Sequence, residues 1–220
     1  EVCGSHTMAI SRGGIRSLLT PNINLISGPG CPVCVTVPGY IDAAIELVDR
    51  DVTVATFGDL IHVPGSTSTL THARASGGRV DVCYSPSDAV ALALRDPAQP
   101  VAFLGVGFET TIPAVVSIVD EAVRRRIDNL SVLTAFKLVP PAMKALLSDP
   151  GLRIDAFLCP AHVSAIIGAA AYEPFAGPRG VPCVIAGFEV LDILLGLEHI
   201  LEQILAGRAN PIRETMLRHL

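Results

Sequence analysis

The sequence predicts an α/β protein in which parallel β-sheets are covered by helices on both faces. Short, continuously apolar runs recur along the chain, and segments with helical periodicity separate them. Half of the 220 residues are hydrophobic and 17% are charged, which is enough apolar material for a buried core. Continuous apolar strands that alternate with helices of about ten residues are typical of βα units.

The predicted elements follow the chain from one end to the other. The predicted strands are the apolar runs at residues 23–27, 52–57, 80–84, 101–106, 130–136, 154–159 and 181–186. The predicted helices lie between and after them, at residues 40–50, 67–75, 87–95, 111–126, 141–147, 163–171 and 190–205. Each apolar run is far shorter than the roughly 20 residues of a membrane-spanning helix, so we expect no membrane association.

A proline-containing segment at residues 96–100 predicts a division into two similar Rossmann-like domains. Its two prolines end the preceding helix and mark a linker. We therefore expect a first domain at residues 1–98 and a second at 99–208, with a carboxy-terminal extension beginning at 209–220. Gly-Phe-Glu occurs at both 107–109 and 187–189. We expect the two sheets to face each other across a cleft.

Charge and cysteine usage exclude several classes of protein. The formal net charge is −5, Lys and Arg cluster only at 124–126, and there is no tryptophan, so nucleic acid is not an expected partner. The six cysteines could form three disulfides in a secreted protein. Because disulfide frameworks serve small, loop-rich domains, a regular apolar core favours a reducing, cytoplasmic setting.

The unusual residues of the chain follow the predicted strands. The segments concerned are 28–34, 58–59, 85–88, 107–111, 137–141 and 160–164. Ligand sites of open α/β sheets form at the carboxyl ends of the strands, so these segments predict a site there.

Two groups of cysteines could carry chemistry. Cys31 and Cys34 form a Cys-x-x-Cys motif, whose spacing suits a redox-active dithiol or half of a metal site. A structural zinc site is disfavoured because the sequence has no second close pair. In a predicted loop, Cys3 and His6 could form an activated nucleophile or bind a soft transition metal.

Other candidate residues also have structural explanations. His162 could hydrogen-bond the loop backbone, and Glu109 could simply favour a helix amino terminus. Cys83 and Cys183 lie within predicted strands, where cysteine usually serves as a small core residue.

The sequence resembles the HypD family, which takes part in the maturation of NiFe hydrogenases. The resemblance covers essentially the whole chain and lies in the segments at residues 1–8, 27–36, 56–59, 63–66, 107–111, 140–143, 162–164 and 187–189. It implies a cytoplasmic scaffold that pairs with the small chaperone HypC. The two proteins would hold iron while it becomes an Fe(CN)₂CO centre, with cyanide delivered from the thiocyanate of HypE.

The resemblance also implies roles for individual residues. Cys3 would ligate the iron, Cys31 and Cys34 would be the redox-active dithiol, and His6 would lie beside them. The crevice would be lined by Gly107, Phe108, Glu109, Thr110, Thr111 and His162. Such a protein would be an assembly scaffold with a redox role rather than a conventional turnover enzyme.

The chain departs from the family pattern in three ways. Met8 replaces a histidine that some members carry, and Cys159 and Ala161 depart from the usual Pro-Gly-His-Val-Ser segment. Members also have a carboxy-terminal region in which four cysteines bind a 4Fe–4S cluster, and these ligands are absent here. We therefore expect the sequence to be a piece of a longer protein.

Two other functions are compatible with parts of the sequence. A thiol–disulfide oxidoreductase acting on a protein partner would use Cys31 and Cys34, but would leave Cys3, His6 and His162 without a role. A nucleotide-binding module would suit the glycine-rich strand ends, but the sequence lacks both a Gly-x-Gly-x-x-Gly and a P-loop motif.

Overall fold

The structure is a computed structural model that describes residues 1–220 except 29, 177–179, 208–212 and 215–220. It divides into two compact units. Residues Pro32–Lys137 form one, here called the central unit, and Glu1–Cys31 together with Leu138–Leu220 form the other, here called the split unit. Each contains a parallel sheet and alternating helices, so the predicted α/β class is confirmed.

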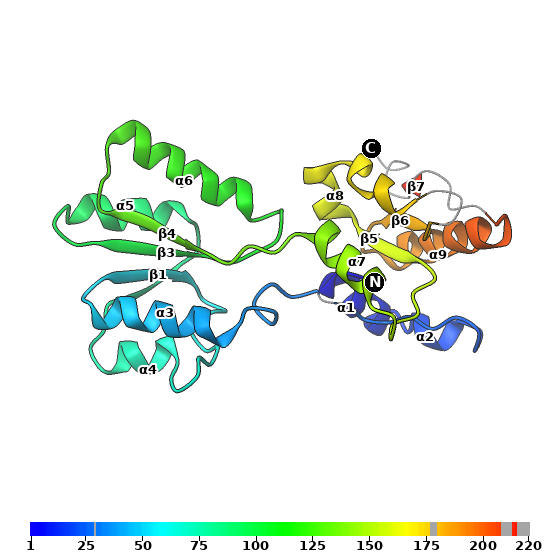
Figure 1. Cartoon of the computed structure of the whole chain (residues 1–220), viewed down its shortest axis with the longest axis horizontal. Coiled ribbons are helices and arrows are strands. Elements are labelled where there is room, and N and C mark those ends of the chain that lie inside the picture. The colour runs from blue at the N-terminus through cyan, green and yellow to red at the C-terminus, as the bar shows by residue number, and fades with distance from the viewer. Residues whose placement is uncertain (29, 177–179, 208–212, 215–220) are drawn as a thin grey trace. The chain divides into compact units, whose positions relative to one another are not determined.

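The central unit is a four-stranded parallel sheet with helices on both faces (Figure 1). Its strand order is β2-β1-β3-β4, built from β1 (Thr53–Phe57), β2 (Val80–Cys83), β3 (Val101–Gly105) and β4 (Leu130–Thr134). The helices are α3 (Pro38–Asp49), α4 (Leu70–Ala75), α5 (Ser87–Arg95) and α6 (Ile112–Arg125).

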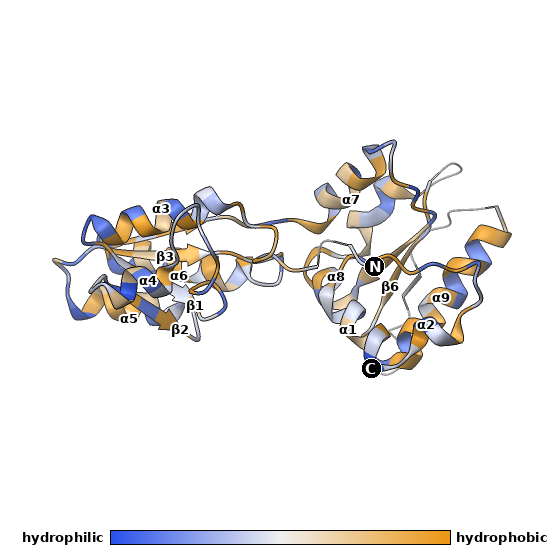
Figure 2. Ribbon diagram, turned by 90° about the horizontal axis from the view of Figure 1, so that it is seen from below, coloured by the Kyte–Doolittle hydropathy of each residue, from blue (hydrophilic) through white to orange (hydrophobic). Residues whose placement is uncertain are grey.

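Side-chain alternation along the strands assigns each helix pair to one face of this sheet. Val54 and Leu104 pack in a core cluster with residues of α3 and α4. Their neighbours Ala55 and Phe103 point to the other face and pack with α5 and α6. Figure 2 shows hydrophilic and hydrophobic residues alternating along helices such as α3, as expected for helices with one buried side.

The split unit contains a three-stranded parallel sheet in the order β5-β6-β7. The strands are β5 (Phe157–Pro160), β6 (Cys183–Ala186) and β7 (Arg213–Glu214). The helices are α1 (Gly4–Arg12), α2 (Ile15–Leu18), α7 (Val139–Ser148), α8 (Ala161–Ile167), the 3₁₀ helix η1 (Ala169–Phe175) and α9 (Val190–Leu205). Ile10 and Ile15 are fully buried against Ile193 of α9 and strand residues such as Val184.

The structure corrects the predicted division of the chain. The segment at 96–100 is a connection within one sheet, because β3 pairs with β1 from Thr53–Val101 onwards. The boundaries at 98 and 99 therefore cut through the central unit, and residues 1–31 belong with 138–220 instead. In the predicted extension 209–220, only Arg213–Glu214 is described, and it is a strand paired with β6.

Two local predictions are also wrong. Residues 23–27 are not a strand of either sheet but a segment without regular secondary structure, which hydrogen-bonds to Glu1 through Ile26. The predicted loop around Cys3 and His6 is the beginning of helix α1. Within the described ranges, no helix combines the length and hydropathy needed to cross a bilayer.

Candidate functional site

The Cys3 segment lies directly against the segment that leads into Cys31. The backbone nitrogen of Glu1 donates to the Ile26 carbonyl at 2.8 Å, and Gly28 N donates to the Glu1 carbonyl at 2.7 Å. Gly4 N then donates to the Gly30 carbonyl at 3.3 Å. These bonds join two segments about 25 residues apart and bring Cys3 next to the residue that precedes Cys31.

Close backbone approach explains two of the glycines in this motif. A Cβ on Gly30 would lie 2.1 Å from Gly4 N and 2.7 Å from the Cys3 carbonyl carbon, and one on Gly28 would lie 2.7 Å from the Glu1 oxygen. All of these atoms are backbone, so none can move aside as a flexible side chain can. Neither glycine has a positive φ, and the requirement is therefore for space rather than for an unusual conformation.

Helix α1 carries Cys3 and His6 into the interior of the split unit. Cys3 is the N-cap of the helix and is 7% exposed, and His6 one turn later is fully buried. His6 Nε2 lies 2.9 Å from the Gly187 oxygen and 3.1 Å from the Ala186 oxygen. Because carbonyl oxygens only accept, Nε2 must carry the proton, which fixes the tautomer.

Burial keeps His6 neutral. Loss of hydration lowers the pKa of its imidazole, and this effect outweighs the two carbonyl contacts, which act to raise the pKa. In the neutral ring, Nδ1 therefore has a lone pair. That atom is buried and accepts no hydrogen bond from the described residues.

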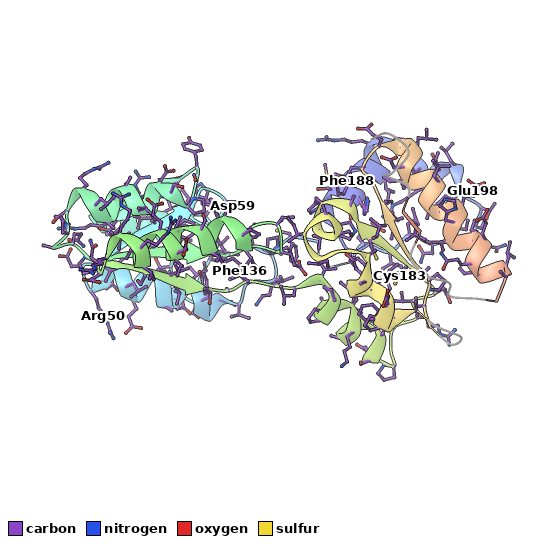
Figure 3. The ribbon with its side chains drawn as sticks, turned by 90° about the horizontal axis from the view of Figure 1, so that it is seen from above. Arg50, Asp59, Phe136, Cys183, Phe188 and Glu198 are labelled. Carbon is purple, nitrogen blue, oxygen red and sulfur yellow. The ribbon has the colours of Figure 1, made fainter. Side chains whose placement is uncertain are left out.

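The ring of Phe188 contacts both histidines of the predicted site, His6 and His162. The ring centroid of Phe188, which is labelled in Figure 3, lies in the split unit. It is 4.7 Å from the ring centroid of His6 and 5.1 Å from that of His162 in α8, and both ring pairs are tilted. Partial burial lowers the pKa of His162. Phe188 was absent from the predicted site residues, although the repeated Gly-Phe-Glu tripeptide was a signal that could have identified it.

Glu1 is a second site residue that the sequence analysis missed. Its carboxylate is fully buried, and Oε1 accepts from Thr7 Oγ1 at 3.1 Å and Ser27 Oγ at 3.0 Å. Arg16 Nη2 lies 3.3 Å from the same oxygen and forms an ion pair with it. The signal available was its position in the same motif as Cys3.

The remaining predicted residues lie in the central unit. Gly107 to Thr111 form the turn between β3 and α6, where a Cβ on Gly107 would meet the Thr111 side chain at 2.4 Å. Glu109 in this turn is buried and Thr110 is exposed, while Phe108 is partly buried. Cys34 is exposed in the segment before α3.

The structure therefore distributes the predicted site over the two units. The split unit holds Cys3, His6, Cys31 and His162, while the central unit holds Cys34 and residues 107–111. The division falls between Cys31 and Pro32, so the Cys-x-x-Cys motif spans both units.

The other cysteines are core residues. Cys83 and Cys183 are buried within β2 and β6, which confirms their prediction. Cys159 in β5 is also fully buried; burial and a hydrogen bond with Cys183 raise the pKa of its thiol. Figure 3 labels Cys183 in the split unit.

A cluster with four cysteine ligands does not fit the residues present. In the part of the chain that the structure describes, no group of three or more His, Cys, Asp or Glu side chains is placed to hold a metal ion.

Comparison with known proteins identifies the family. The sequence model of HypD, described as "Hydrogenase formation hypA family", matches residues 1–216. The chain belongs to the HypD family. The resemblance noted in the sequence is thereby confirmed.

Curated relatives extend this match. The chain is 45% identical to the hydrogenase maturation factor HypD of Cupriavidus necator over 97% of its own length and 59% of the relative. It is 44% identical to HypD of Rhodobacter capsulatus, covering 95% of this chain and 56% of that protein. It is 42% identical to HypD of Escherichia coli K12, covering 96% of this chain and 57% of that protein. The chain thus spans under three fifths of the length of these relatives.

Proposed function

We propose that this HypD-family chain is part of an iron-assembly scaffold for the NiFe hydrogenase centre. Together with a HypC-type chaperone in the cytoplasm, it would hold iron as cargo while cyanide and carbon monoxide are attached to form Fe(CN)₂CO. Cys3 would be the iron ligand of this chain, and a HypE-type protein would donate the cyanide. Support comes from the family and from relatives named hydrogenase maturation factors.

One structural observation carries the proposal: Cys3 is buried beside the residue preceding Cys31, in the same unit as His6 and His162. A thiolate suits soft metal ions, and burial limits the access of water to a ligand bound there. His6 is neutral and has its Nε2 proton bound to carbonyls, so it adds no positive charge near the thiolate.

Cys31 and Cys34 would act as the redox-active pair. Oxidation of two thiols to a disulfide releases two electrons and two protons. Release of cyanide from a thiocyanate, giving a thiol and hydrogen cyanide, consumes two electrons and two protons. The dithiol therefore has the stoichiometry that this step requires. The loop at residues 107–111 and His162 would contact the cargo or its donor.

Infrared spectroscopy under anaerobic conditions tests the scaffold. The full-length protein is produced with the chaperone and the other maturation proteins, as wild type, as Cys3→Ala and as Cys83→Ala. Cys83 is a buried thiol outside the site and provides a matched control. We expect cyanide and carbon monoxide stretching bands in the wild type and in Cys83→Ala, and none in Cys3→Ala. Bands that persist in Cys3→Ala would reject Cys3 as the ligand.

The exposure of Cys34 favours a second candidate function, thiol–disulfide exchange with a protein partner. The same Cys3→Ala variant separates the two. A simple dithiol oxidoreductase keeps its exchange activity when Cys3 is removed, whereas the scaffold loses its iron.

A further inference from the structure

The carboxylate of Glu1 connects three segments around Cys3. Its Oε1 accepts hydrogen bonds from Thr7 in α1, from Arg16 in α2 and from Ser27 in the segment before Cys31. The Thr7 hydroxyl is also 3.3 Å from the Cys3 carbonyl oxygen, so the network reaches the backbone of Cys3 itself. Glu1 Oε1 thus accepts hydrogen bonds both from the segment that contains Cys3 and from the segment that leads to Cys31.

The partners of Glu1 are bound to one another as well. Arg16 Nη2 lies 3.3 Å from Ser27 Oγ, and its Nη1 donates to the Leu25 carbonyl. Ser27 Oγ therefore hydrogen-bonds to both members of the ion pair, Glu1 and Arg16. Since Gly28 N donates to the Glu1 carbonyl, main chain and side chain of Glu1 bind the same neighbouring segment.

Packing alone does not explain a carboxylate at this position. The side chain is completely buried, and Oε2 accepts no hydrogen bond from the described residues. Burying a charge is costly, and an apolar side chain of similar size would fill the space at a lower cost. What the carboxylate supplies instead is a directional link between segments.

We propose that Glu1 is a positioning residue, whose network with Thr7, Arg16 and Ser27 holds the Cys3 segment in register with the segment that carries Cys31. This rests on the proposed function in so far as Cys3 is the iron ligand. Residues that orient metal ligands typically change metal affinity by about 10–100-fold when they are replaced.

The first test measures the register without any metal. Amide hydrogen exchange at Gly4 and Gly28 reports the two hydrogen bonds that join the segments. In Glu1→Ala we expect exchange at both amides to accelerate by about tenfold or more, because the charged hydrogen bonds that close this region are lost. Glu1→Gln keeps an acceptor for Thr7 and Ser27 but loses the ion pair, so its exchange should be intermediate.

The second test follows the cargo in the complex with the chaperone, using the full-length protein. Iron retention should fall by about tenfold or more in Glu1→Ala and less in Glu1→Gln, and the cyanide stretching frequencies of the remaining iron should shift. Glu46→Ala is the matched control, because Glu46 forms an exposed ion pair with Arg50 in the central unit. Its exchange rates at Gly4 and Gly28 and its infrared spectrum should equal those of the wild type.

The two tests separate the positioning role from the scaffold function. Wild-type exchange at Gly4 and Gly28 in Glu1→Ala would overturn the positioning role, whatever the infrared result. An unchanged infrared spectrum and unchanged iron retention in this variant would also overturn it. Absence of bands in the wild type would refute the scaffold instead, while the exchange data would still decide the role of Glu1. Should Glu1→Ala fail to fold, Glu1→Gln and Ser27→Ala provide the same comparison.

Discussion

Replacement of Gly30 by alanine should separate the Cys3 segment from the segment of Cys31. The new methyl carbon would lie 2.1 Å from Gly4 N, 2.7 Å from the Cys3 carbonyl carbon and 2.9 Å from Gly4 Cα. Ordinary van der Waals contact requires at least 3.4 Å. The two backbones must therefore move apart by about 1 Å or more, because backbone atoms in close-packed regions cannot reorient as side chains do.

Two contributions determine the expected loss of stability. Overpacking of a close contact costs about 1–3 kcal/mol. Loss of the hydrogen bond between Gly4 N and the Gly30 oxygen costs about 0.5–1.5 kcal/mol more. We therefore expect the free energy of unfolding of the split unit to fall by about 1.5–4.5 kcal/mol.

Gly39→Ala is the matched control. Gly39 lies in the first turn of α3, and a Cβ there would meet no atom within 4 Å. Because alanine is the better helix former, this substitution should be neutral or stabilise by up to about 1 kcal/mol.

Urea denaturation and thiol mapping measure the outcome. Unfolding followed by circular dichroism gives the stability, and alkylation followed by peptide mass spectrometry gives the accessibility of Cys3. In Gly30→Ala, Cys3 should react faster than in the wild type, where it is 7% exposed. If Gly30→Ala unfolds at the wild-type urea concentration and Cys3 stays protected, the proposed close contact between the segments is refuted.

Three further predictions concern protonation, thiol reactivity and ring packing. Because burial lowers the pKa of His6 in the folded state, the unfolded chain binds the proton more tightly. The contribution of neutral His6 to the free energy of unfolding is complete above the pKa of a histidine in the unfolded chain, about 6.5, and is lost as the pH falls below that value. The urea concentration at the unfolding midpoint should therefore decrease between about pH 6.5 and 5. Iodoacetamide should modify the exposed Cys34 in the native protein, but Cys159 and Cys183 only after unfolding. Phe188→Leu removes two ring contacts worth about 0.5–1.5 kcal/mol each, and should shift the imidazole proton resonances of His6.

Each of these has a clear contrary result. A His6→Gln variant that retains the full decrease in midpoint below pH 6.5 would assign the pH effect to other groups. Rapid native labelling of Cys159 would contradict its burial in β5. Unchanged histidine resonances in Phe188→Leu would show that the rings do not pack as described.

Local patterns predicted most of the elements. The helices at Ser87–Arg95 and Val190–Leu205 have the predicted bounds, and each of the six strands predicted after residue 50 begins or ends within one residue of the observed strand. Apolar runs and proline positions are local signals, so they identify elements without reference to their partners.

The assignment of segments to units could not be predicted in the same way. A buried face on α1 indicates that the helix packs against something, but not that Ile10 meets Ile193 at the other end of the chain. The prolines at 97 and 100 end a helix equally well inside a sheet and between domains. Helix α1 was not predicted because it begins with Gly4 and Ser5, which are weak helix formers. His6 of this helix is buried and contacts the Ala186 oxygen at the end of β6, and such tertiary packing stabilises a helix whose own propensity is low.

For the candidate site, the residue types were predictable but their arrangement was not. The cysteines and histidines carry recognisable chemistry in their own positions. The roles of Gly28 and Gly30 depend on backbone atoms almost 30 residues earlier, and that of Phe188 depends on two histidines from separate helices. Such tertiary contacts have no local signature.

The split unit also has a consequence for the order of events during synthesis. The central unit can fold as soon as residues 32–137 have left the ribosome, but the first 31 residues must wait for β5, β6 and α9. At about 5–20 residues per second, that wait lasts roughly 10–30 s. Throughout this interval the thiol of Cys3 and the side chains of Ile10 and Ile15 are accessible on the nascent chain. The residue proposed to bind iron is therefore open to solvent, oxidants and chaperones until the later segments of its unit have been synthesised.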